Sequence, residues 1–412
     1  MSERKGALSR LRVLDMGRVL AAPFIGQLFG DLGADVIKVE RPVNGDDFRS
    51  TSVFLTDKDG KKTKESDYFL STNRNKRSIT VDLSNPEGQA LIRKLAAQCD
   101  VLIENYKVGD LARYGLDYES LSKINLRLVY CSVSAYGQTG PYRNRTGYDS
   151  LFQAQSGIMS VTGHPDGHPG AGPMKTGVSI GDMNGSFHAA FAILAAIYHR
   201  DMVSGEGQYI DLSLLDANIA VLSHAAQYFF ITGEGPPRAG TGAPGGAPVG
   251  AHRCKDGDIM ISGSMDTAFQ KLAKALGHPE WLEDPRFRNN AARRQNKPAV
   301  TAAVEGAIAH LTKKEVEKLL TDNGVSSAIV YTVPEVFADP QVQHRGMKVE
   351  VPHPTSHDGK VTLVASPMRL SKTPVAGYTA PPTLGQHTDE VLKEVLGMDD
   401  AGIAALRDAK AI

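Results

Sequence analysis

Short apolar runs alternate with helix-like segments over the first third of the chain, and this alternation constrains the fold more than any other feature. Between the runs, FIGQLFGDLG (24–33) is apolar at helical spacing, and Asn85 precedes a proline where the next helix should begin. Such alternation predicts the α/β class, with a Rossmann-like, doubly wound parallel sheet. Strand-like runs lie in LRVLD (11–15), DVIKVE (35–40), TNRNKRSITVDL (72–83), DVLIEN (100–105) and LRLVYCSVSAYG (126–137).

The second half of the chain changes character after a further strand, YIDLSL (209–214), and a helix that we expect to run through Phe230. The segment Gly233–His252 is rich in glycine and proline, which indicates a loop or linker. HRCKDGDIMISG (252–263) then predicts a β-hairpin, and one last helix is expected from Thr388. We predict a large domain from 1–229, a smaller α+β domain from 230–325, and a return to the large domain over 326–412.

Bulk properties exclude several classes of function. Lys+Arg and Asp+Glu both number 46, and a nucleic-acid-binding protein would have a basic excess. No window approaches 18 uninterrupted apolar residues, and the N-terminus lacks an apolar signal region, so no membrane partner is expected. The cysteines Cys99, Cys131 and Cys254 are scattered, which favours a reducing, cytoplasmic location.

Ligands of doubly wound sheets bind beyond the carboxyl ends of the strands. The first such loop, after Asp15, lacks the glycine fingerprint of a dinucleotide site, which argues against NAD or FAD. Asn105 and Tyr106 follow a strand and offer a polar and an aromatic surface for an adenine. A single basic residue is more often a solvated charge, but several at one sheet edge indicate a phosphate-rich ligand. The basic residues near strand ends are Arg18, Lys38, Arg41, Arg74, Lys76, Arg77, Lys107 and Arg113.

The segment GVSIG (177–181) fits the G-x-S-x-G pattern of a serine hydrolase elbow around Ser179. That elbow needs an apolar strand before the motif and a helix directly after the serine. Here a glycine and proline loop, HPGAGPMKT (168–176), comes first, and the helical pattern begins only around 182–186. We therefore interpret Ser179 as a loop residue.

Asp182 stands where the following helix should begin, and two interpretations stay open. Aspartate is a favoured N-cap residue, whose carboxylate accepts backbone N–H bonds. Alternatively, it is a nucleophile, because a helix N-terminus favours the ionised carboxylate and free amides there would stabilise an oxyanion. Gly181 and Gly185 would then let a substrate approach the backbone closely.

Metal ligands are not indicated. His164 and His168 in HPDGHP lack a third ligand nearby, and the chain has no H-E-x-x-H or C-x-x-C motif. We interpret both histidines as surface residues and expect no metal.

Six segments resemble, in order, the signature segments of the family III CoA-transferases, which include formyl-CoA transferase and carnitine CoA-transferase. The resemblance implies an interlocked homodimer, with coenzyme A as co-substrate, no other cofactor, and acyl-CoA and small carboxylic acids as substrates. The segments are LDMGRVLAAPFIGQLFGDLGADVIKVERPVNGDD (14–47), STNRNKRSITVDL (71–83), DVLIENYKVGDLARYGL (100–116), YCSVSAYGQTGPYRNRTGYD (130–149), GDMNG (181–185) and LGQHTDEVL (384–392).

The resemblance also implies roles for residues. The family's catalytic aspartate falls on Asp182, and its mobile glycine loop falls loosely on 240–250, which includes Gly245 and Gly246. Formyl-CoA transferase has histidine at the position of Arg18 and glutamine at that of Leu20, which implies a different acyl acceptor here. From the resemblance and the basic residues together, the predicted CoA-binding residues are Arg18, Val19, Ala21, Arg41, Arg77, Asn105, Tyr106 and Arg113.

The mechanism that follows is covalent: Asp182 attacks the thioester of an acyl-CoA and becomes an aspartyl-CoA thioester, which an acceptor carboxylate then resolves. The related α-methylacyl-CoA racemases use a histidine at the position of Tyr148, and a phenol with a pKa near 10 is a poor base at neutral pH. Tyrosine at this position therefore favours a transferase over an isomerase. The competing hypotheses are a racemase-type isomerase and a CoA-binding protein in which Asp182 is only a cap.

Two further segments, LSLLDANIAVLSHAAQYFFITG (212–233) and FADPQVQHRGM (337–347), resemble the succinyl-CoA:glutarate transferases of this family. The resemblance implies succinyl-CoA as donor and a dicarboxylate such as glutarate as acceptor. The sequence does not identify the cation that would hold the second carboxylate.

Overall fold

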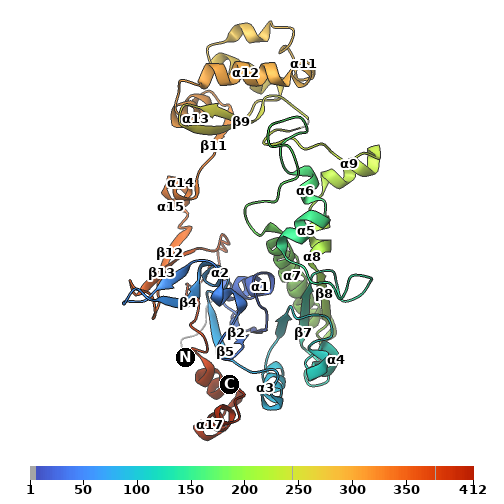
Figure 1. Ribbon diagram of the computed structural model, residues 1–412, viewed down its shortest axis with the longest axis vertical. Coiled ribbons are helices and arrows are strands. Elements are labelled where there is room, and N and C mark those ends of the chain that lie inside the picture. Colours follow the sequence, from blue (N-terminus) through green and yellow to red (C-terminus); the bar gives the residue numbers. More distant parts are fainter. Residues whose placement is uncertain (1–5, 244, 376) are drawn as a thin grey trace. The chain divides into compact units, whose positions relative to one another are not determined.

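The computed structural model describes residues 6–243, 245–375 and 377–412. The chain divides into two compact units, which we describe separately (Figure 1). The first contains residues up to Ser156, Gly177–Val221 and Gln341–Ile412, and the second contains Gly157–Thr176 and Leu222–Pro340. The chain therefore passes between the units four times. The predicted small domain, 230–325, lies within the second unit.

The first unit is built on a six-stranded sheet in the order β5-β2-β1-β6-β7-β8, and every neighbouring pair is parallel. The predicted parallel sheet is thus confirmed. Its strands are β1 (Arg12–Asp15), β2 (Asp35–Glu40), β5 (Lys76–Thr80), β6 (Val101–Glu104), β7 (Val129–Ser134) and β8 (Tyr209–Ser213).

Helices cover both faces of this sheet because alternate strand residues point to opposite sides. On one face, Leu14 and Ile37 pack with Leu91 and with Leu392 near the C-terminus of the chain. On the other face, Val13 packs with residues of α1 and α7. Each fully buried leucine or isoleucine contributes about 1.5–3 kcal/mol relative to exposure. The sheet is therefore doubly wound.

The helices of the first unit begin at capping signals where the sequence provides them. Asn85 accepts the N–H of Glu87 at the start of α3, with Pro86 as its first residue. The helices are α1 (Ala21–Asp31), α2 (Asp67–Thr72), α3 (Pro86–Ala96), α4 (Tyr118–Leu121), α5 (Asp149–Gln155), α7 (Ile180–His199), α8 (Leu214–Ala220), α16 (Thr388–Leu396) and α17 (Asp400–Asp408), with short 3₁₀ or π turns at Asp47–Ser50, Ala112–Tyr114 and Arg200–Ser204. Two hairpins pair β3 (Phe54–Thr56) with β4 (Lys62–Ser66) and β12 (Lys348–Pro352) with β13 (Lys360–Val364).

The second unit contains an antiparallel sheet in the order β11-β10-β9, packed with helices around a separate apolar core. The predicted hairpin is present, with Cys254 opposite Gly257 at its turn. Its elements are β9 (Val249–Cys254), β10 (Gly257–Ser262), β11 (Ser326–Ile329), α6 (Ile158–Val161), α9 (His224–Thr232), α10 (Asp266–Ala275), α11 (Asn290–Gln295), α12 (Lys297–Ile308), α13 (Lys313–Asp322), α14 (Val333–Ala338), a 3₁₀ turn at Pro279–Leu282, and α15 (Pro340–His344), which crosses the unit boundary.

Two helix predictions were wrong in their extent. The helix expected through Phe230 is divided into α8 and α9, because Ser223 adopts a positive φ of 47° that no helix accommodates. The last helix is also two, α16 and α17, separated by Gly397 in the left-handed conformation.

One helical segment, Ile180–Ser204, is long and apolar enough to cross a membrane by length and composition alone, and α8 with α9 passes the same test only as a bent pair. The buried side of α7, including Ala189, Ile193 and Ala196, packs on the sheet. Core helices of soluble proteins commonly meet this criterion as well.

Candidate active site

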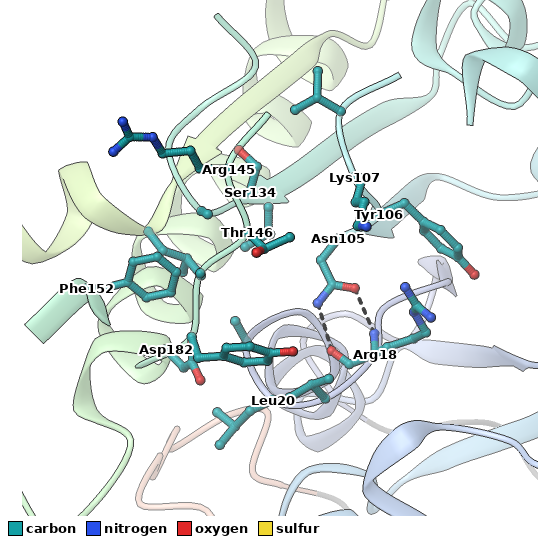
Figure 2. A pocket seen from close by; sticks show the side chains of 18 of the residues that line it. Arg18, Leu20, Asn105, Tyr106, Lys107, Ser134, Arg145, Thr146, Phe152 and Asp182 are labelled. Carbon is teal, nitrogen blue, oxygen red and sulfur yellow. Dashed lines mark hydrogen bonds between the residues drawn. The ribbon is translucent and has the colours of Figure 1, made fainter. Parts of the chain in front are cut away.

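A cavity of about 410 Å³ opens beyond the carboxyl ends of β1, β6 and β7. Each of these strands continues into a loop that contributes lining residues, as expected for ligand sites on doubly wound sheets. Figure 2 shows side chains from these loops and from α7 facing the same space. The lining residues used below are Arg18, Val19, Leu20, Ala21, Asp47, Asn105, Tyr106, Lys107, Asp110, Ser134, Arg143, Arg145, Tyr148, Phe152 and Asp182.

The loops after β1 and β6 are joined by a reciprocal pair of hydrogen bonds. The Arg18 N–H donates to Asn105 Oδ1 at 2.9 Å, and Asn105 Nδ2 donates to the Arg18 carbonyl at 2.7 Å (Figure 2). The Arg18 guanidinium lies over the Tyr106 ring, 4.7 Å from its centroid. Arg18 Nη1 also lies 3.7 Å from Asp47 Oδ2, so the ring and this carboxylate together hold the cation at the cavity wall.

A buried ion pair between Lys38 and Asp46 fixes the position of the loop after β1. Lys38 Nζ donates to the Gly17 carbonyl and to Asp46 Oδ2, both at 2.9 Å. Asp46 Oδ1 accepts the N–H of Val19 at 3.0 Å, which holds Val19 at an unusual φ of 70°. Lys38 is therefore wrong as a phosphate ligand, because its charge is fully buried and already paired.

The N-terminus of α7 is capped by a residue from another helix. Asp149 Oδ1 accepts the N–H of Gly181 at 2.8 Å and that of Asp182 at 3.3 Å. Ser179, at the N-cap position, makes no side-chain capping bond. The interpretation of Asp182 as the N-cap is therefore wrong, since it lies inside the first turn of α7. The same bonds occupy the N–H groups of Gly181 and Asp182, so these two amides are not free to stabilise an oxyanion.

The Asp182 side chain itself is half-buried and lines the cavity. Among the residues that the structure describes, no hydrogen bond or ion pair to its carboxylate is found. Burial, together with the negative charge of Asp149, raises the pKa of Asp182 to about 7. Protonated and ionised forms thus coexist near neutral pH, and only the ionised form can act as a nucleophile.

The glycines beside Asp182 have a packing role, which corrects the idea that they admit substrate. A Cβ on Gly181 would lie 2.9 Å from Asp149 Oδ1, and a Cβ on Gly185 would lie 2.2 Å from Leu214 Cδ2. Glycine at these positions lets the side-chain ends of Asp149 in α5 and Leu214 in α8 lie close to α7, and neither glycine lines the cavity.

Ser179 does not acquire the setting of a hydrolase nucleophile. The helix α7 begins at Ile180, two residues earlier than expected, so a helix does follow the serine directly. The segment 172–179 that precedes it contains no strand, however, and Ser179 does not line the cavity. The elbow still lacks its strand.

The structure brings together most of the residues predicted to bind CoA. Arg18, Val19, Ala21, Asn105 and Tyr106 line the same cavity as Asp182 and Tyr148. Arg41 and Arg113 do not line this cavity but form ion pairs with residues that do. Arg41 pairs with the lining residue Asp47, and Arg113 pairs with the lining residue Asp110.

Arg77 is not part of this cavity. It pairs with Asp35 at the amino end of β2 and with Glu390 and Glu394 of α16. A residue at the start of a parallel strand lies at the sheet edge opposite the ligand loops, so its proposed place in the phosphate cluster was wrong. Arg74 and Lys76 are likewise buried in ion pairs, with Asp31 and Asp15.

The predicted lid glycines belong to the second unit. Gly245 is exposed, whereas Gly246 is buried and a Cβ there would lie 2.3 Å from Ser264 Cβ. Pro244, within the expected loop, lies outside the described residues.

Two features of the site were missed in the sequence. Arg143 and Arg145 line the cavity from the loop after β7. Asp149 caps α7 and contributes to the raised pKa of Asp182. The basic pair in YRNRTGYD was visible, but nothing in the pattern connected Asp149 to a helix 31 positions later.

Within the described residues no group of three potential metal ligands occurs, and His164 and His168 stack with ring centroids 4.5 Å apart.

The chain matches the sequence model of CoA-transferase family III over residues 8–388. It belongs to this family. Succinate–glutarate CoA-transferase from Agrobacterium fabrum is 41% identical over 397 residues, covering 96% of this chain and 97% of the relative. Human succinyl-CoA:glutarate CoA-transferase is 38% identical over 403 residues, covering 98% and 89%. The crystal structure of a CaiB/BaiF family protein from Brucella suis superposes with a TM-score of 0.87 at 39% identity, covering 95% of this chain and 100% of that chain.

These similarities confirm the resemblance read from the sequence and identify the chain as an enzyme of the CoA-transferase type. The racemase alternative is less supported. The Brucella suis structure also supports the doubly wound α/β fold, since it covers nearly the whole chain.

Proposed function

We propose that this enzyme transfers CoA from succinyl-CoA to a dicarboxylate such as glutarate, through a covalent thioester on Asp182. One observation carries the proposal. Of the three acidic residues that line the cavity, Asp47 and Asp110 form ion pairs with arginines, and only Asp182 has no such partner within the described residues. A carboxylate without an ion-pair partner is available for nucleophilic attack.

The chemistry proceeds by exchange of acyl bonds. An ionised Asp182 oxygen attacks the thioester carbon of succinyl-CoA, and the C–S bond breaks. The CoA thiolate departs, and a mixed anhydride between succinate and Asp182 remains. The thiolate then attacks the aspartyl carbon and releases succinate, which gives the aspartyl-CoA thioester. Glutarate repeats both steps in reverse and leaves as glutaryl-CoA, with Asp182 regenerated.

The cavity wall suits the CoA that must be held during these steps. Arg18, Lys107, Arg143 and Arg145 provide cations for its phosphates. Tyr106 provides an aromatic face for adenine, although the Arg18 guanidinium already lies over this ring. Water must be excluded from the anhydride and the thioester, and the segment around Gly245 and Gly246 is our candidate for the lid.

The choice of acids rests on the relatives, because the names of the Agrobacterium and human enzymes both specify glutarate and succinate or succinyl-CoA.

The three cysteines are buried free thiols, which fits the cytoplasmic location expected from the sequence.

A second copy of the chain completes the proposal. The outer face of α7 exposes Phe187, Phe191, Leu194 and Tyr198 at helical spacing. Contiguous apolar surface of this kind usually marks a protein interface, so we assign it to the homodimer that the family resemblance implies.

The decisive experiment traps the covalent intermediate. The purified enzyme is incubated with succinyl-CoA and hydroxylamine, and peptide mass spectrometry is expected to find a hydroxamate at Asp182. Asp182→Asn should lower CoA exchange by at least about 10³-fold, whereas Ser179→Ala should retain exchange. Full activity of Asp182→Asn, or loss of activity in Ser179→Ala alone, would refute the assignment.

A further inference from the structure

The second unit contains a cavity of its own, about 430 Å³ in volume. It lies between the glycine- and proline-rich segment before β9, the strand β9 itself and the first half of α12. The wall includes Gly242, Gly246 and Gly250 from this segment and strand, the stretch in which the sequence predicts the lid. None of the lining residues belongs to the first unit.

His252 forms part of this wall and is only 3% exposed. Neither ring nitrogen has a hydrogen-bond partner among the described residues. The nearest acid, Glu305, has its Oε1 3.9 Å from Nδ1, which is beyond hydrogen-bond distance. Buried imidazoles are normally satisfied, so a buried ring that faces a cavity with both nitrogens unpaired indicates a missing polar partner.

The charged groups around the cavity indicate that the missing partner carries a negative charge. Arg238 and Lys297 line it, together with the hydroxyls of Thr241 and Thr301, and no described acidic residue does. Lys297 Nζ donates to the Ala243 carbonyl at 2.9 Å, which holds the ammonium at the wall. Arg238 is paired with Asp166, whose side chain is 90% exposed, so this acid neutralises the arginine from the solvent side.

Apolar atoms make up the rest of the wall. Pro165, Ala239, Pro248 and Val249 contribute aliphatic surface between the polar groups. A hydrated inorganic anion gains little from such surface, whereas a short methylene chain is stabilised by it. Donors and cations separated by aliphatic surface match a small aliphatic carboxylate.

We propose that this cavity binds a small aliphatic carboxylic acid in its ionised form, held by the His252 ring N–H and the Lys297 ammonium. The acid is the acceptor or the released product of the transfer, and this part of the inference rests on the proposed function.

Isothermal titration calorimetry tests the site directly, with glutarate added to the full-length enzyme in the absence of CoA. We expect saturable binding by the wild type and by Asp182→Asn. His252→Phe, which keeps a ring but removes both nitrogens, should weaken binding at least tenfold, and Lys297→Met should do likewise. The matched control is His168→Phe, since His168 is exposed and outside the cavity, and it should bind as the wild type does.

A thermal unfolding scan separates loss of the site from loss of the fold. His252→Phe is expected to unfold at or above the wild-type temperature, because a buried polar ring without partners is replaced by an apolar one. Equal glutarate affinity in His252→Phe and wild type would overturn the proposal. So would the absence of binding by wild type, or equal binding of the neutral analogue 1,5-pentanediol or of inorganic phosphate.

The two proposals fail separately. Because the titration contains no CoA, its outcome does not depend on transfer chemistry. Full CoA exchange by Asp182→Asn would refute the catalytic assignment and leave a carboxylate site in place, whereas a normal hydroxamate at Asp182 with no glutarate binding would refute only this cavity.

Discussion

Asp182 lies in the first turn of α7, yet the helix N-terminus is neutralised by Asp149 rather than by Asp182 itself. The capping carboxylate therefore acts in two ways. It fixes the position of the backbone that carries Asp182, and its negative charge, after burial, is the second cause of the raised pKa of Asp182. The proposed nucleophile is thus held in place by a group that also opposes its ionisation.

This coupling predicts the pH dependence of transfer. The reaction needs ionised Asp182, so kcat/KM should fall as the pH drops below about 7, the pKa of this group. Asp149→Asn keeps an oxygen that can cap α7 but removes the charge, so the acid limb should shift to lower pH by on the order of one unit.

The matched control for this measurement is Glu104→Gln. Glu104 is buried below the cavity loops, accepts hydrogen bonds from Ser132 and from the N–H of Tyr106, and has a pKa raised to about 7 by burial. The acid limb should stay in place in this variant. A limb that moves with Glu104→Gln and ignores Asp149→Asn would assign the titration to the wrong carboxyl group.

The sequence pointed to Asp182, Asn105 and Tyr106 as site residues because their segments resemble those of the family in order, and all three line one cavity. The contact from Asp149 to the Asp182 amide spans 33 residues, and only the packing of α5 on α7 creates it. Local pattern therefore pointed to the proposed nucleophile and missed Asp149, whose charge contributes to its raised pKa.

At the scale of elements, buried strands were predictable where their apolar runs are continuous, as in Val101-Leu102-Ile103 of the fully buried β6. The charges near strand ends were harder to interpret. Lys38 points into a buried pair with Asp46, and Arg77 lies at the opposite sheet edge. The sequence shows which residues are basic, but only the folded structure shows which carboxylate pairs with each of them.

The pair between β2 and the loop after it gives a prediction about stability. Lys38→Met leaves Asp46 buried without its partner and should lower the free energy of unfolding by about 3–5 kcal/mol. The double variant Lys38→Met/Asp46→Asn should recover part of that loss. Urea unfolding followed by circular dichroism measures both, with the exposed Lys61→Met as control. Additive losses in the double variant would show that the two side chains are not coupled.

At the scale of the whole molecule, the exposed aromatic residues of α7 should determine oligomeric state. Phe191 is 77% exposed, so Phe191→Glu should leave the fold intact and convert the proposed dimer into a monomer, because it places a charge in an apolar interface. Sedimentation velocity measures the mass. Leu126→Glu, at an exposed apolar residue outside the α7 face, should remain dimeric. A monomeric wild type, or a dimeric Phe191→Glu, would contradict the proposed interface.

The position of the last helices has a consequence for biosynthesis. Val391, Leu392, Ile403 and Leu406 of α16 and α17 complete the apolar layer over strands formed by the first third of the chain. While a ribosome is still translating residues before Thr388, α3 already covers part of that sheet face. The part that α16 and α17 will cover still exposes apolar side chains to solvent. We therefore expect nascent chains to engage chaperones until translation is nearly finished, and a premature stop before Thr388 to yield inclusion bodies rather than a smaller working enzyme.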